Sequence, residues 1–361
     1  MNRPRIIDVA KQAGVSKTAV SFAYNRPGSL NAATRDRILA AADQLGYRPS
    51  PIARRLARQR TDQIGLVIPQ PTHDMFANPF LAELIRGIGD ICDGEGIAVV
   101  VVPPVHGSIS NAVDAALVDG LILLGLSSAH PDFERVGRAS MPIVALAVED
   151  WEVGGIAIDD IGGAQAAAEH LRDLGHRDVA VLLIGPHPDS PGSELTGISA
   201  RRLAGVRRGF GLDPGEDHDG ATQLRLVSRT VSEAEGRDAF AELAAGGLPS
   251  AVMAMSDVTA IGVMNAAADY GVRIPDDLSI VGFDDIPAAS WVTPRLTTVH
   301  QPIRDLGRLA ARRLVDSIRS GDAIEMNRLI PTRLIVRGST ASPSGIQPRI
   351  HRRGGEVLGD S

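Results

Sequence analysis

The stretch DVAKQAGVSKTAVSFAYN, residues 8–25, combines two short helical patterns with a tight turn between them. Apolar residues recur at helical spacing on both sides of this turn, and Gly14 can take left-handed backbone angles at no steric cost. Ser16 is a natural N-cap for the second helix. Two helices joined in this way match the helix-turn-helix layout, whose second helix enters the DNA major groove. An ordinary helical hairpin is the alternative interpretation.

The second helix of this stretch carries polar side chains where a recognition helix faces DNA, namely Lys17, Thr18 and Ser21. A third helix is predicted over AATRDRILAAADQLG, because its apolar residues form a single stripe and Asn31 precedes it as a capping residue. Residues 1–48 are therefore expected to form an all-α helix-turn-helix headpiece.

Charge separates the N-terminal segment from the rest of the chain. Residues 1–60 contain twelve Lys and Arg and three acidic residues, which gives a net charge of +9, whereas the remaining residues carry −15. A basic segment on an acidic body favours contact of that segment with a polyanion such as nucleic acid. A solvated basic face is the alternative.

Residues 49–61 differ from the segments on either side. Two prolines prevent a helix at the start, and IARRLARQR could then form two helical turns with Leu56, and Ala53 near it, on one side. A helix this short is marginal on its own. We expect a hinge that becomes ordered on binding.

From residue 62 the pattern changes to alternating strands and helices. Buried apolar strands that alternate with helices predict parallel sheets covered on both faces, and two such series predict two Rossmann-like lobes. The strand-like runs are QIGLVIP, IAVVVVP, GLILLG, PIVALAV and GIAID in the first series, and VAVLLIG, LRLVS, AVMAMS and LSIVGFDD in the second. A last helix, 303–319, and a last strand, 328–336, must join one lobe or the other.

The body is expected to span residues 62–340. The tail, residues 341–361, lacks periodicity and is expected to be disordered.

Composition and motif content exclude several classes of protein. Cys92 is the single cysteine, which excludes an intrachain disulfide and a cysteine-based zinc site. The nine histidines lack metal-ligand spacing, and neither a nucleophile elbow nor a phosphate loop occurs. We therefore expect no metal, no cofactor and no enzymatic activity. No apolar run approaches the roughly 18 residues of a membrane span, and no secretory signal is recognisable, so we expect a cytoplasmic protein without a membrane partner.

Taken together, the motifs resemble those of the lactose-repressor (LacI/GalR) family of bacterial transcription regulators. The headpiece carries DVAKQAGVS and TRDRILAAADQLGY, and the body carries VDGLILLG, HLRDLGHRDVAVLLIG, RLAGVRRGF, SDVTAIGVMNAAADYGVRIPDDLSIVGFDD and LTTVHQP, in register over about residues 5–337. The resemblance implies an all-α headpiece followed by an α/β, two-lobed, periplasmic-binding-protein-like effector domain with three crossing segments. In this arrangement about 62–160 and 297–325 form the first lobe, and about 161–294 and 326–340 form the second. It also implies a homodimer on near-palindromic double-stranded DNA.

The resemblance assigns roles to the headpiece and hinge. Lys17 and Thr18 match base-reading positions, and Phe22 stands where well-known members often carry arginine. Since phenylalanine offers only apolar contact, for example to a thymine methyl group, operator preference at that base pair should differ. Leu56, near Ala53, matches the hinge leucine that wedges into the minor groove, with packing within the hinge of a dimer as the alternative. The residues at phosphate-holding positions are Ser16, Ser21 and Asn25.

In the body, the resemblance implies a ligand cleft between the lobes. Arg202 matches an effector-contacting arginine that could hold sugar hydroxyls, a carboxylate or a phosphate, and Asp284 matches an acid at the cleft. Ser256 and Asp257 follow the strand AVMAMS at its cleft end, although helix capping is an equal alternative for Asp257. Phe80 matches a contact from the first lobe.

Two features depart from the family pattern. Ala147 stands where the family commonly has an acid, for which Glu149 or Asp150 could substitute, and the segment 187–197 is long. The effector is expected to be a carbohydrate or a derivative of one.

The sequence therefore predicts a DNA-binding transcriptional regulator, as a rule a repressor in this family, controlled by a small molecule. A solute-binding protein without a DNA role is the first alternative, and a sugar-modifying enzyme is the second.

Overall fold

The computed structural model describes the chain in separate ranges, and by its internal contacts the chain divides into two compact units. The first comprises Met1–Gln63 with Leu117–Asp119, and the second comprises Ile64–Ala116 with Gly120–Ser361. Each unit is considered by itself. The described residues are 4–25, 27–48, 60–68, 75, 78–126, 130–147, 155–185, 197–324 and 328–344.

The headpiece contains three helices whose ends follow the expected capping residues. Gly14 ends the first helix at φ 63°, and the Ser16 hydroxyl oxygen accepts a hydrogen bond from the Ala19 amide (3.1 Å). The Asn31 side chain accepts one from the Thr34 amide (2.8 Å). The predicted helix-turn-helix is therefore confirmed. Its elements are α1 (Ile6–Ala13), α2 (Lys17–Asn25), the 3-10 turn η1 (Pro27–Ser29) and α3 (Ala32–Gln44).

The headpiece has a small core of its own, to which all three helices contribute. Gln12 on α1 donates to Gln44 on α3 (2.7 Å), and the rings of Tyr24 and Tyr47 meet edge to face with centroids 6.3 Å apart. Burial of apolar side chains stabilises helices that would be marginal alone. The core residues are Val9, Ala10, Ala13, Val20, Ala23, Ile38, Ala41 and Ala42.

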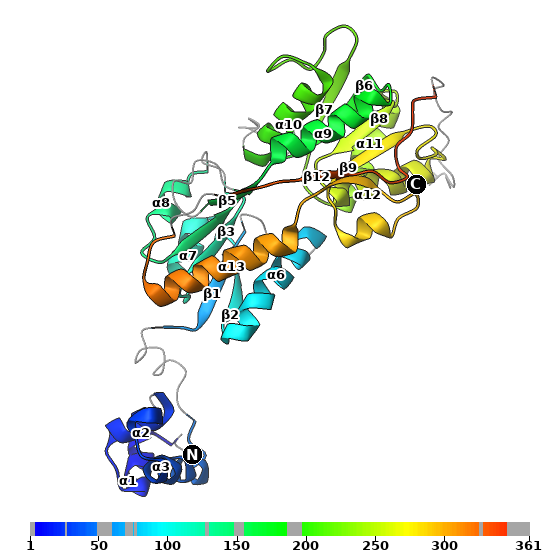
Figure 1. The fold of residues 1–361 in the computed structure, drawn as a ribbon. Helices are drawn as coiled ribbons and strands as arrows, with labels where there is room; N and C mark the ends of the chain where they lie inside the picture. Colours follow the sequence, from blue (N-terminus) through cyan, green and yellow to red (C-terminus); the bar gives the residue numbers. More distant parts are fainter. Residues whose placement is uncertain are drawn as a thin grey trace, which may run out of the picture. The chain divides into compact units, whose positions relative to one another are not determined.

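The body contains two largely parallel sheets, one in each lobe (Figure 1). The first has the order β11-β5-β4-β3-β1-β2, and the second has the order β12-β10-β9-β8-β6-β7, in which β12 pairs antiparallel with β10. The first-sheet strands are β1 (Gln63–Val67), β2 (Ala98–Val102), β3 (Leu121–Leu124), β4 (Ile143–Leu146), β5 (Gly155–Ile158) and β11 (Arg328–Ile330). The second-sheet strands are β6 (Asp178–Ile184), β7 (Gln223–Arg229), β8 (Ala251–Ala254), β9 (Ser279–Asp284), β10 (Thr297–His300) and β12 (Arg333–Ile335).

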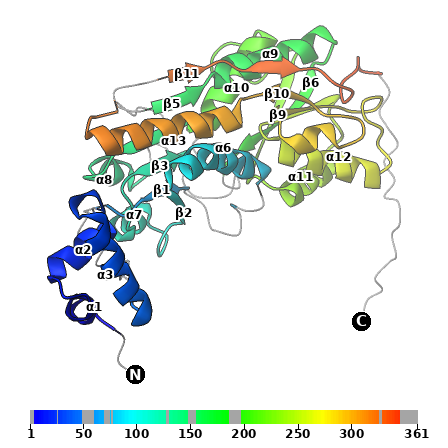
Figure 2. The same ribbon diagram turned by 60° about the horizontal axis from the view of Figure 1, so that its bottom comes forward.

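Helices cover the sheets in pairs, as alternating strands and helices require. In the first lobe α6 packs along α13, and Figure 2 shows the two side by side. In the second lobe α9 packs on α10, and α11 packs on α12. The helices are α6 (Pro79–Glu95), α7 (Ile109–Ala115), α8 (Phe133–Gly137), α9 (Asp160–Asp173), α10 (Gly197–Phe210), α11 (Glu233–Ala245), α12 (Asp257–Asp269), η2 (Pro287–Ser290) and α13 (Ile303–Ser320).

The chain crosses between the lobes three times, and two of these crossings differ from the expected lobe boundaries. The segment 297–325 was expected in the first lobe, but β10 pairs with β9 in the second sheet, so this crossing follows His300. The segment 326–340 was expected in the second lobe, but β11 pairs with β5 in the first sheet. Apolar patterns identify strands, whereas long-range pairing decides which sheet each strand joins.

The expected strand 328–336 is in fact two strands in different sheets. Pro331, which has no N–H to donate, lies between β11 and β12. At this crossing the Thr332 hydroxyl donates to the Asp159 carbonyl (2.9 Å), and the Asp159 amide donates to the Ile330 carbonyl (2.8 Å). The first and third crossings are therefore joined by hydrogen bonds.

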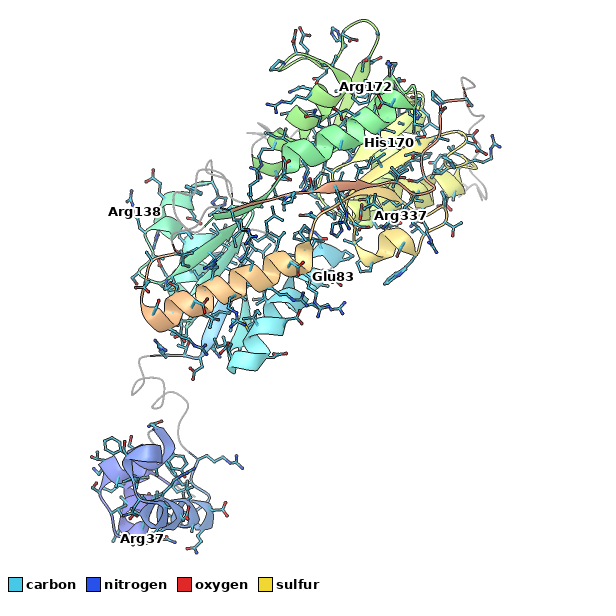
Figure 3. All side chains as sticks on the ribbon, viewed as in Figure 1. Arg37, Glu83, Arg138, His170, Arg172 and Arg337 are labelled. Atoms are coloured by element: carbon cyan, nitrogen blue, oxygen red, sulfur yellow. The ribbon has the colours of Figure 1, made fainter. Side chains whose placement is uncertain are left out.

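Beyond β12 the chain stays attached to the second lobe up to the last described residue, 344. His170 on α9 contacts the Thr340 hydroxyl (3.0 Å; His170 is labelled in Figure 3), and the Ala341 carbonyl accepts from His176 (2.9 Å) and Ser279 (3.0 Å). Residues 341–344 therefore differ from the expected disordered tail, because side chains of the second lobe bind this backbone. Residues 345–361 lie outside the described ranges.

Candidate functional site

The first turn of α2 is open to solvent. Lys17 and Thr18 are exposed, as is Ser16 before them. Because the Ser16 oxygen only accepts in its capping bond, its hydroxyl proton remains able to donate to an anion. The partial positive charge of a helix N-terminus also favours an anion here. This end of α2 is suited to phosphate contacts, and Lys17 and Thr18, which were predicted to read bases, follow directly after Ser16.

The other headpiece candidates lie farther along α2. Phe22 is half-buried. The Asn25 amide nitrogen donates to the Ser21 hydroxyl (3.2 Å), and the Asn25 side-chain oxygen is buried without a hydrogen-bond partner among the described residues. The hinge candidates Ala53 and Leu56 lie outside the described residues.

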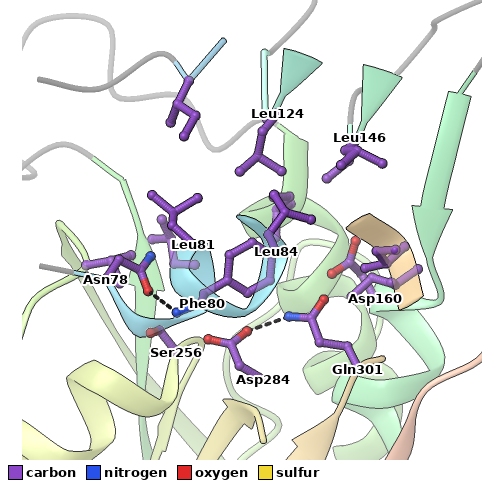
Figure 4. Close-up of a pocket in the computed structure, with 18 of the residues that line it drawn as sticks. Asn78, Phe80, Leu81, Leu84, Leu124, Leu146, Asp160, Ser256, Asp284 and Gln301 are labelled. Atoms are coloured by element: carbon purple, nitrogen blue, oxygen red, sulfur yellow. Dashed lines mark hydrogen bonds between the residues drawn. The ribbon is translucent and has the colours of Figure 1, made fainter. Parts of the chain in front are cut away.

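A cavity of about 190 Å³ lies between the two lobes of the body (Figure 4). Four of the five effector candidates, Phe80, Arg202, Ser256 and Asp284, line it, and Asp257 does not. The polar lining residues are Asn78, Asp160, Arg202, Ser256, Asp284 and Gln301. The others are Ile68, Phe80, Leu81, Leu84, Leu124, Gly125, Leu146, Ala147, Ile156, Ile158, Ile184, Ile198, Val231 and Leu306.

The first-lobe side of the cavity is almost entirely apolar among the described residues. Leu124 and Leu146 end neighbouring parallel strands of the first sheet, and Phe80 and Leu84 project from the first turns of α6 (Figure 4). Asn78 is the polar exception, and its side-chain oxygen already accepts from the Phe80 amide (3.0 Å).

Ala147 extends this apolar wall from an unusual backbone conformation. Its φ is 54°, in the left-handed region, which among non-glycine residues Asn and Asp adopt most readily. An alanine there costs about 1–2 kcal/mol. The backbone at this position therefore suits the acid that the family commonly has, yet the side chain on the wall is a methyl group. Glu149 and Asp150 lie outside the described residues.

The opposite side of the cavity is built around the buried guanidinium of Arg202. Its Nε donates to Asp160 Oδ1 (2.8 Å), one terminal nitrogen donates to the Met255 carbonyl (2.5 Å), and its carbon lies 3.6 Å from the centre of the Phe283 ring. Asp160 also accepts from Arg201 (2.9 Å). Arg202 is thus fixed in one orientation, which favours a stable contact with a ligand.

Asp284 ends β9 at the cavity. It is buried, and its Oδ1 accepts from the Gln301 side-chain amide (2.5 Å; Figure 4). Its φ of 130° is a conformation that side chains rarely adopt, and such backbones concentrate at functional sites. The second carboxylate oxygen of Asp284 and the side-chain oxygen of Gln301 can both accept a hydrogen bond from a ligand.

Ser256 lines the cavity with a buried hydroxyl group that could bind a ligand. The residue is 2% exposed, and its hydroxyl has no hydrogen-bond partner among the described residues. It occupies the N-cap position of α12 without making a capping bond. Because buried polar groups are nearly always hydrogen-bonded, this hydroxyl is best explained by a ligand or a water molecule in the cavity.

Asp257 is buried behind the cavity wall. Its carboxylate accepts from the Thr298 hydroxyl and from the Ile286 amide (2.9 Å), so it holds strand β10 and the loop after β9. Asp257 was expected either to contact the ligand or to cap a helix, and these two hydrogen bonds do neither. Burial raises the pKa of Asp257, and the nearby carboxylate of Asp284 raises it further. Burial likewise raises the pKa of Asp284, against the opposing charge of Arg202.

Both halves of this arrangement match known protein families. Residues 5–50 match the family described as bacterial regulatory proteins, lacI family, and residues 168–340 match the periplasmic binding protein-like domain. The HTH-type transcriptional regulator DegA of Bacillus subtilis is 30% identical over 93% of this chain and 98% of its own length. The chain belongs to the lacI family of bacterial regulatory proteins.

Solved structures of lacI-family regulators match the whole architecture. The lac repressor dimer bound to operator and the anti-inducer ONPF is 28% identical, with a TM-score of 0.75, and the match covers 94% of this chain and 100% of that one. A complex of the regulator CelR with cellobiose is 29% identical, with a TM-score of 0.65, and covers 93% and 100%. The headpiece and the two-lobed body of this chain are therefore the two parts of a lacI-family regulator.

Three polar residues of the cavity, Asn78, Asp160 and Gln301, were not predicted from the sequence. No motif distinguishes Asp160 from other acids at strand ends, or Gln301 from its neighbours in LTTVHQP. Both lie directly at crossings between the lobes, where side chains from either sheet converge. Knowing that crossings border the cleft of this lacI-family body would have identified both positions.

Other types of site are not found in the described part of the chain. There, no group of three or more His, Cys, Asp or Glu side chains could hold a metal ion. No helix in the same ranges is both long and apolar enough to cross a membrane.

Proposed function

We propose that this lacI-family regulator is a homodimeric repressor whose affinity for DNA depends on a small molecule bound between the lobes. The observation that carries the proposal is the presence, in one chain, of a helix-turn-helix headpiece and a cleft with an unsatisfied buried hydroxyl, Ser256. A solute-binding protein without a DNA role would have no use for the first feature. Such a regulator acts in the cytoplasm and joins the nucleoid when it is bound to its operator.

On the DNA side, each headpiece reads one half of a near-palindromic operator. Ser16, Ser21 and Asn25 hold phosphates, while Lys17 and Thr18 contact base edges. Leu56 enters the minor groove from the hinge, beside Ala53. The exposure of the first turn of α2 supports the assignments of Ser16, Lys17 and Thr18.

On the ligand side, Arg202, Ser256 and Asp284 bind the polar groups of the effector, and Phe80 lies against its apolar part. The CelR structure contains cellobiose, which supports a carbohydrate or carbohydrate derivative as the effector here. Asp160 fixes Arg202, and Gln301 orients Asp284. Asp160 and Asp284 have no catalytic role in this proposal.

Ligand and DNA are coupled through two states of the body. Residues from both lobes and from two crossings line the cavity, so a ligand favours the lobe arrangement that matches its own shape. A typical coupling changes operator affinity about 5–150-fold. By linkage, operator DNA changes ligand affinity by the same factor.

The proposal is tested by selecting operator sequences from random duplex DNA with the full chain, followed by a gel shift at several salt concentrations. We expect an enriched near-palindromic site whose binding weakens steeply with salt. Enrichment of no sequence, with no salt-sensitive shift, would leave the solute-binding alternative. Turnover of a sugar that Asp284→Asn abolishes while binding persists would instead support the sugar-modifying enzyme.

A further inference from the structure

The end of the hinge is held by the carboxylate of Asp119. Its Oδ1 accepts hydrogen bonds from the Thr61 amide (2.6 Å) and the Thr61 hydroxyl (2.9 Å), and its Oδ2 accepts one from the Asp62 amide (2.8 Å). The Asp119 amide in turn donates to the Gln63 carbonyl (2.8 Å). Asp119 thus bonds to three successive residues at the point where the hinge ends and β1 begins, and we call this set of bonds the clamp.

The backbone turns sharply within the clamp. Asp62 has a φ of 53°, in the left-handed region, which residues with a side chain adopt only at a cost. Such a conformation persists where the surrounding structure holds it. Here the amides of Thr61 and Asp62 donate to the same carboxylate, which fixes the turn. The clamp therefore sets the direction in which the chain leaves β1 toward the hinge.

Asp119 is itself held in place through the residue that follows it. A Cβ atom at Gly120 would lie 2.8 Å from Leu314 Cδ1 on α13 and 3.1 Å from the Pro142 carbonyl oxygen, so Gly120 packs closely against its neighbours. From Gly120 the chain continues into β3, whose last residue, Leu124, lines the cavity. The position of Asp119 therefore depends on β3 through the covalent chain.

We propose that Asp119 is a positioning residue for operator binding. Leu56, which the proposed function places in the minor groove, lies five positions before Thr61 in the sequence. By fixing Thr61 and Asp62, Asp119 limits the arrangements that the hinge samples before it meets DNA, so less conformational entropy is lost on specific binding. Non-specific binding depends on phosphate contacts and does not need this restriction. The inference rests on the proposed function, because it concerns the operator of that function.

The test compares two DNA duplexes with the full chain below its melting temperature. Fluorescence anisotropy measures the dissociation constants of the selected operator and of a scrambled duplex of the same length. In Asp119→Ala we expect the operator dissociation constant to rise about tenfold, and that of the scrambled duplex to change by less than about twofold. Asp114→Asn, at a side chain of α7 that is 60% exposed, is the control and should change neither. A lower melting temperature with an unchanged ratio of the two dissociation constants would overturn the proposal.

Two further variants show whether the effect passes through the hydrogen bonds of the clamp. Asp119→Asn keeps one side-chain oxygen as an acceptor and should lose less operator affinity than Asp119→Ala. Thr61→Val removes the hydroxyl and should weaken operator binding. Combined with Asp119→Ala it should add no further loss, because the bond is already absent. Independent losses from the two substitutions, or no loss from either, would contradict this route. Asp119→Asn and Thr61→Val also decide the question if Asp119→Ala does not fold.

Amide hydrogen exchange separates a failure of this inference from a failure of the proposed function. In Asp119→Ala the amides of Thr61 and Asp62 should exchange at least about tenfold faster, while those of Ile64 and Leu66 in β1 stay protected. Unchanged exchange at Thr61 and Asp62 would overturn the inference whatever the DNA result.

The DNA measurements divide the remaining outcomes. If the wild type selects an operator and the Asp119 variants bind it equally well, the proposed function stands and the inference fails. If the wild type selects no operator, the proposed function fails, and the exchange rates show whether Asp119 holds the end of the hinge.

Discussion

At the scale of single residues, Asp160 holds the polar side of the cavity together. Its side chain is fully buried and accepts hydrogen bonds from Arg201 and Arg202, whose side chains are 21% and 4% exposed. Buried charges of this kind depend on one another, because removing one partner leaves the other charge uncompensated. The orientation of Arg202 therefore depends on a residue that need not touch the ligand.

Substitution of Asp160 tests this dependence. Asp160→Asn keeps the shape but removes the buried carboxylate that both guanidinium groups bind, and should lower the free energy of unfolding by about 3 kcal/mol. Asp173→Asn, at the other end of α9, removes a carboxylate that is 70% exposed and should change it by less than about 0.5 kcal/mol. Urea denaturation measures both. Equal effects of the two substitutions would show that Asp160 has no special role.

The buried Asp257 predicts a dependence of stability on pH. Because its pKa is raised in the folded state, Asp257 still holds a proton at pH values where the unfolded chain, with an aspartate pKa of about 3.9, has lost it. The folded state then binds more protons, so this contribution to stability is complete below pH 4 and declines toward neutral pH. The charged groups that face Asp257 are Asp284 and Asp285.

Asp257→Asn should lessen the decline in stability toward neutral pH, since the side-chain amide of asparagine does not titrate. Its oxygen can still accept a hydrogen bond from the Ile286 backbone amide. The measurement is the melting temperature from pH 4.5 to pH 8, compared between the wild type and the variant. Asp276→Asn, at a side chain that is 64% exposed, is the control and should keep the wild-type slope. A slope in Asp257→Asn as steep as that of the wild type would show that Asp257 titrates normally.

At the scale of elements, α6 and α13 pack with their backbones in contact. A Cβ atom at Gly87 would lie 2.0 Å from the Arg304 carbonyl oxygen, and one at Gly307 would lie 2.3 Å from the Leu84 carbonyl oxygen. Both helices carry part of the apolar wall, including Leu306 on α13. Close packing of this pair therefore sets the width of the first-lobe side of the cavity.

Gly307→Ala tests that packing. The added methyl group meets backbone that cannot move aside cheaply, so we expect a loss of about 1–3 kcal/mol of unfolding free energy. Gly89→Ala, also on the helix α6, points into open space and should be neutral or stabilise by up to about 1 kcal/mol. Thermal unfolding distinguishes the two. Equal behaviour of the two variants would show that the helices are not in close contact.

The recognition helix α2 makes a separate prediction through Phe22. Phe22→Arg should change the preferred base at one position of each half-site toward guanine, because arginine pairs with the two acceptors of guanine. Phe22→Leu keeps an apolar contact and should retain the wild-type preference. Sequencing of DNA selected by each protein measures both. If the arginine variant selects the wild-type operator, Phe22 does not face bases.

At the scale of the whole molecule, helical and strand patterns predicted the fold class, while pairing between distant strands could not be read from them. The turn at Gly14 and the caps at Ser16 and Asn31 were correctly predicted because capping is local. Residues 297–300 and 328–330 were assigned to the wrong lobes. The lobe to which a strand belongs depends on the strands that it pairs with, and its own residues do not reveal them.

The candidate site, like the lobe assignment, could be predicted only in part from the sequence. Arg202, Ser256 and Asp284 were recognised from motifs, and they line the cavity. Asp160 and Gln301 were missed, because their closeness to the cavity depends on where the chain crosses between the lobes. The bonds of Asp257 were missed because Thr298 is 41 positions away in the chain.

The charge division between residues 1–60, at +9, and the acidic remainder suits a molecule in which one part binds DNA and the other senses a ligand.

The central claim is that the cavity between the lobes controls operator affinity. The most direct test is a fluorescence-anisotropy titration of the selected operator with the full chain, with and without the compound that most raises the melting temperature of the chain in a screen of sugars and sugar derivatives. We predict that this compound changes the operator dissociation constant about 5–150-fold in the wild type, and that Ser256→Ala needs more of the compound for the same change. An operator dissociation constant that stays the same while the compound saturates the cavity would contradict the account.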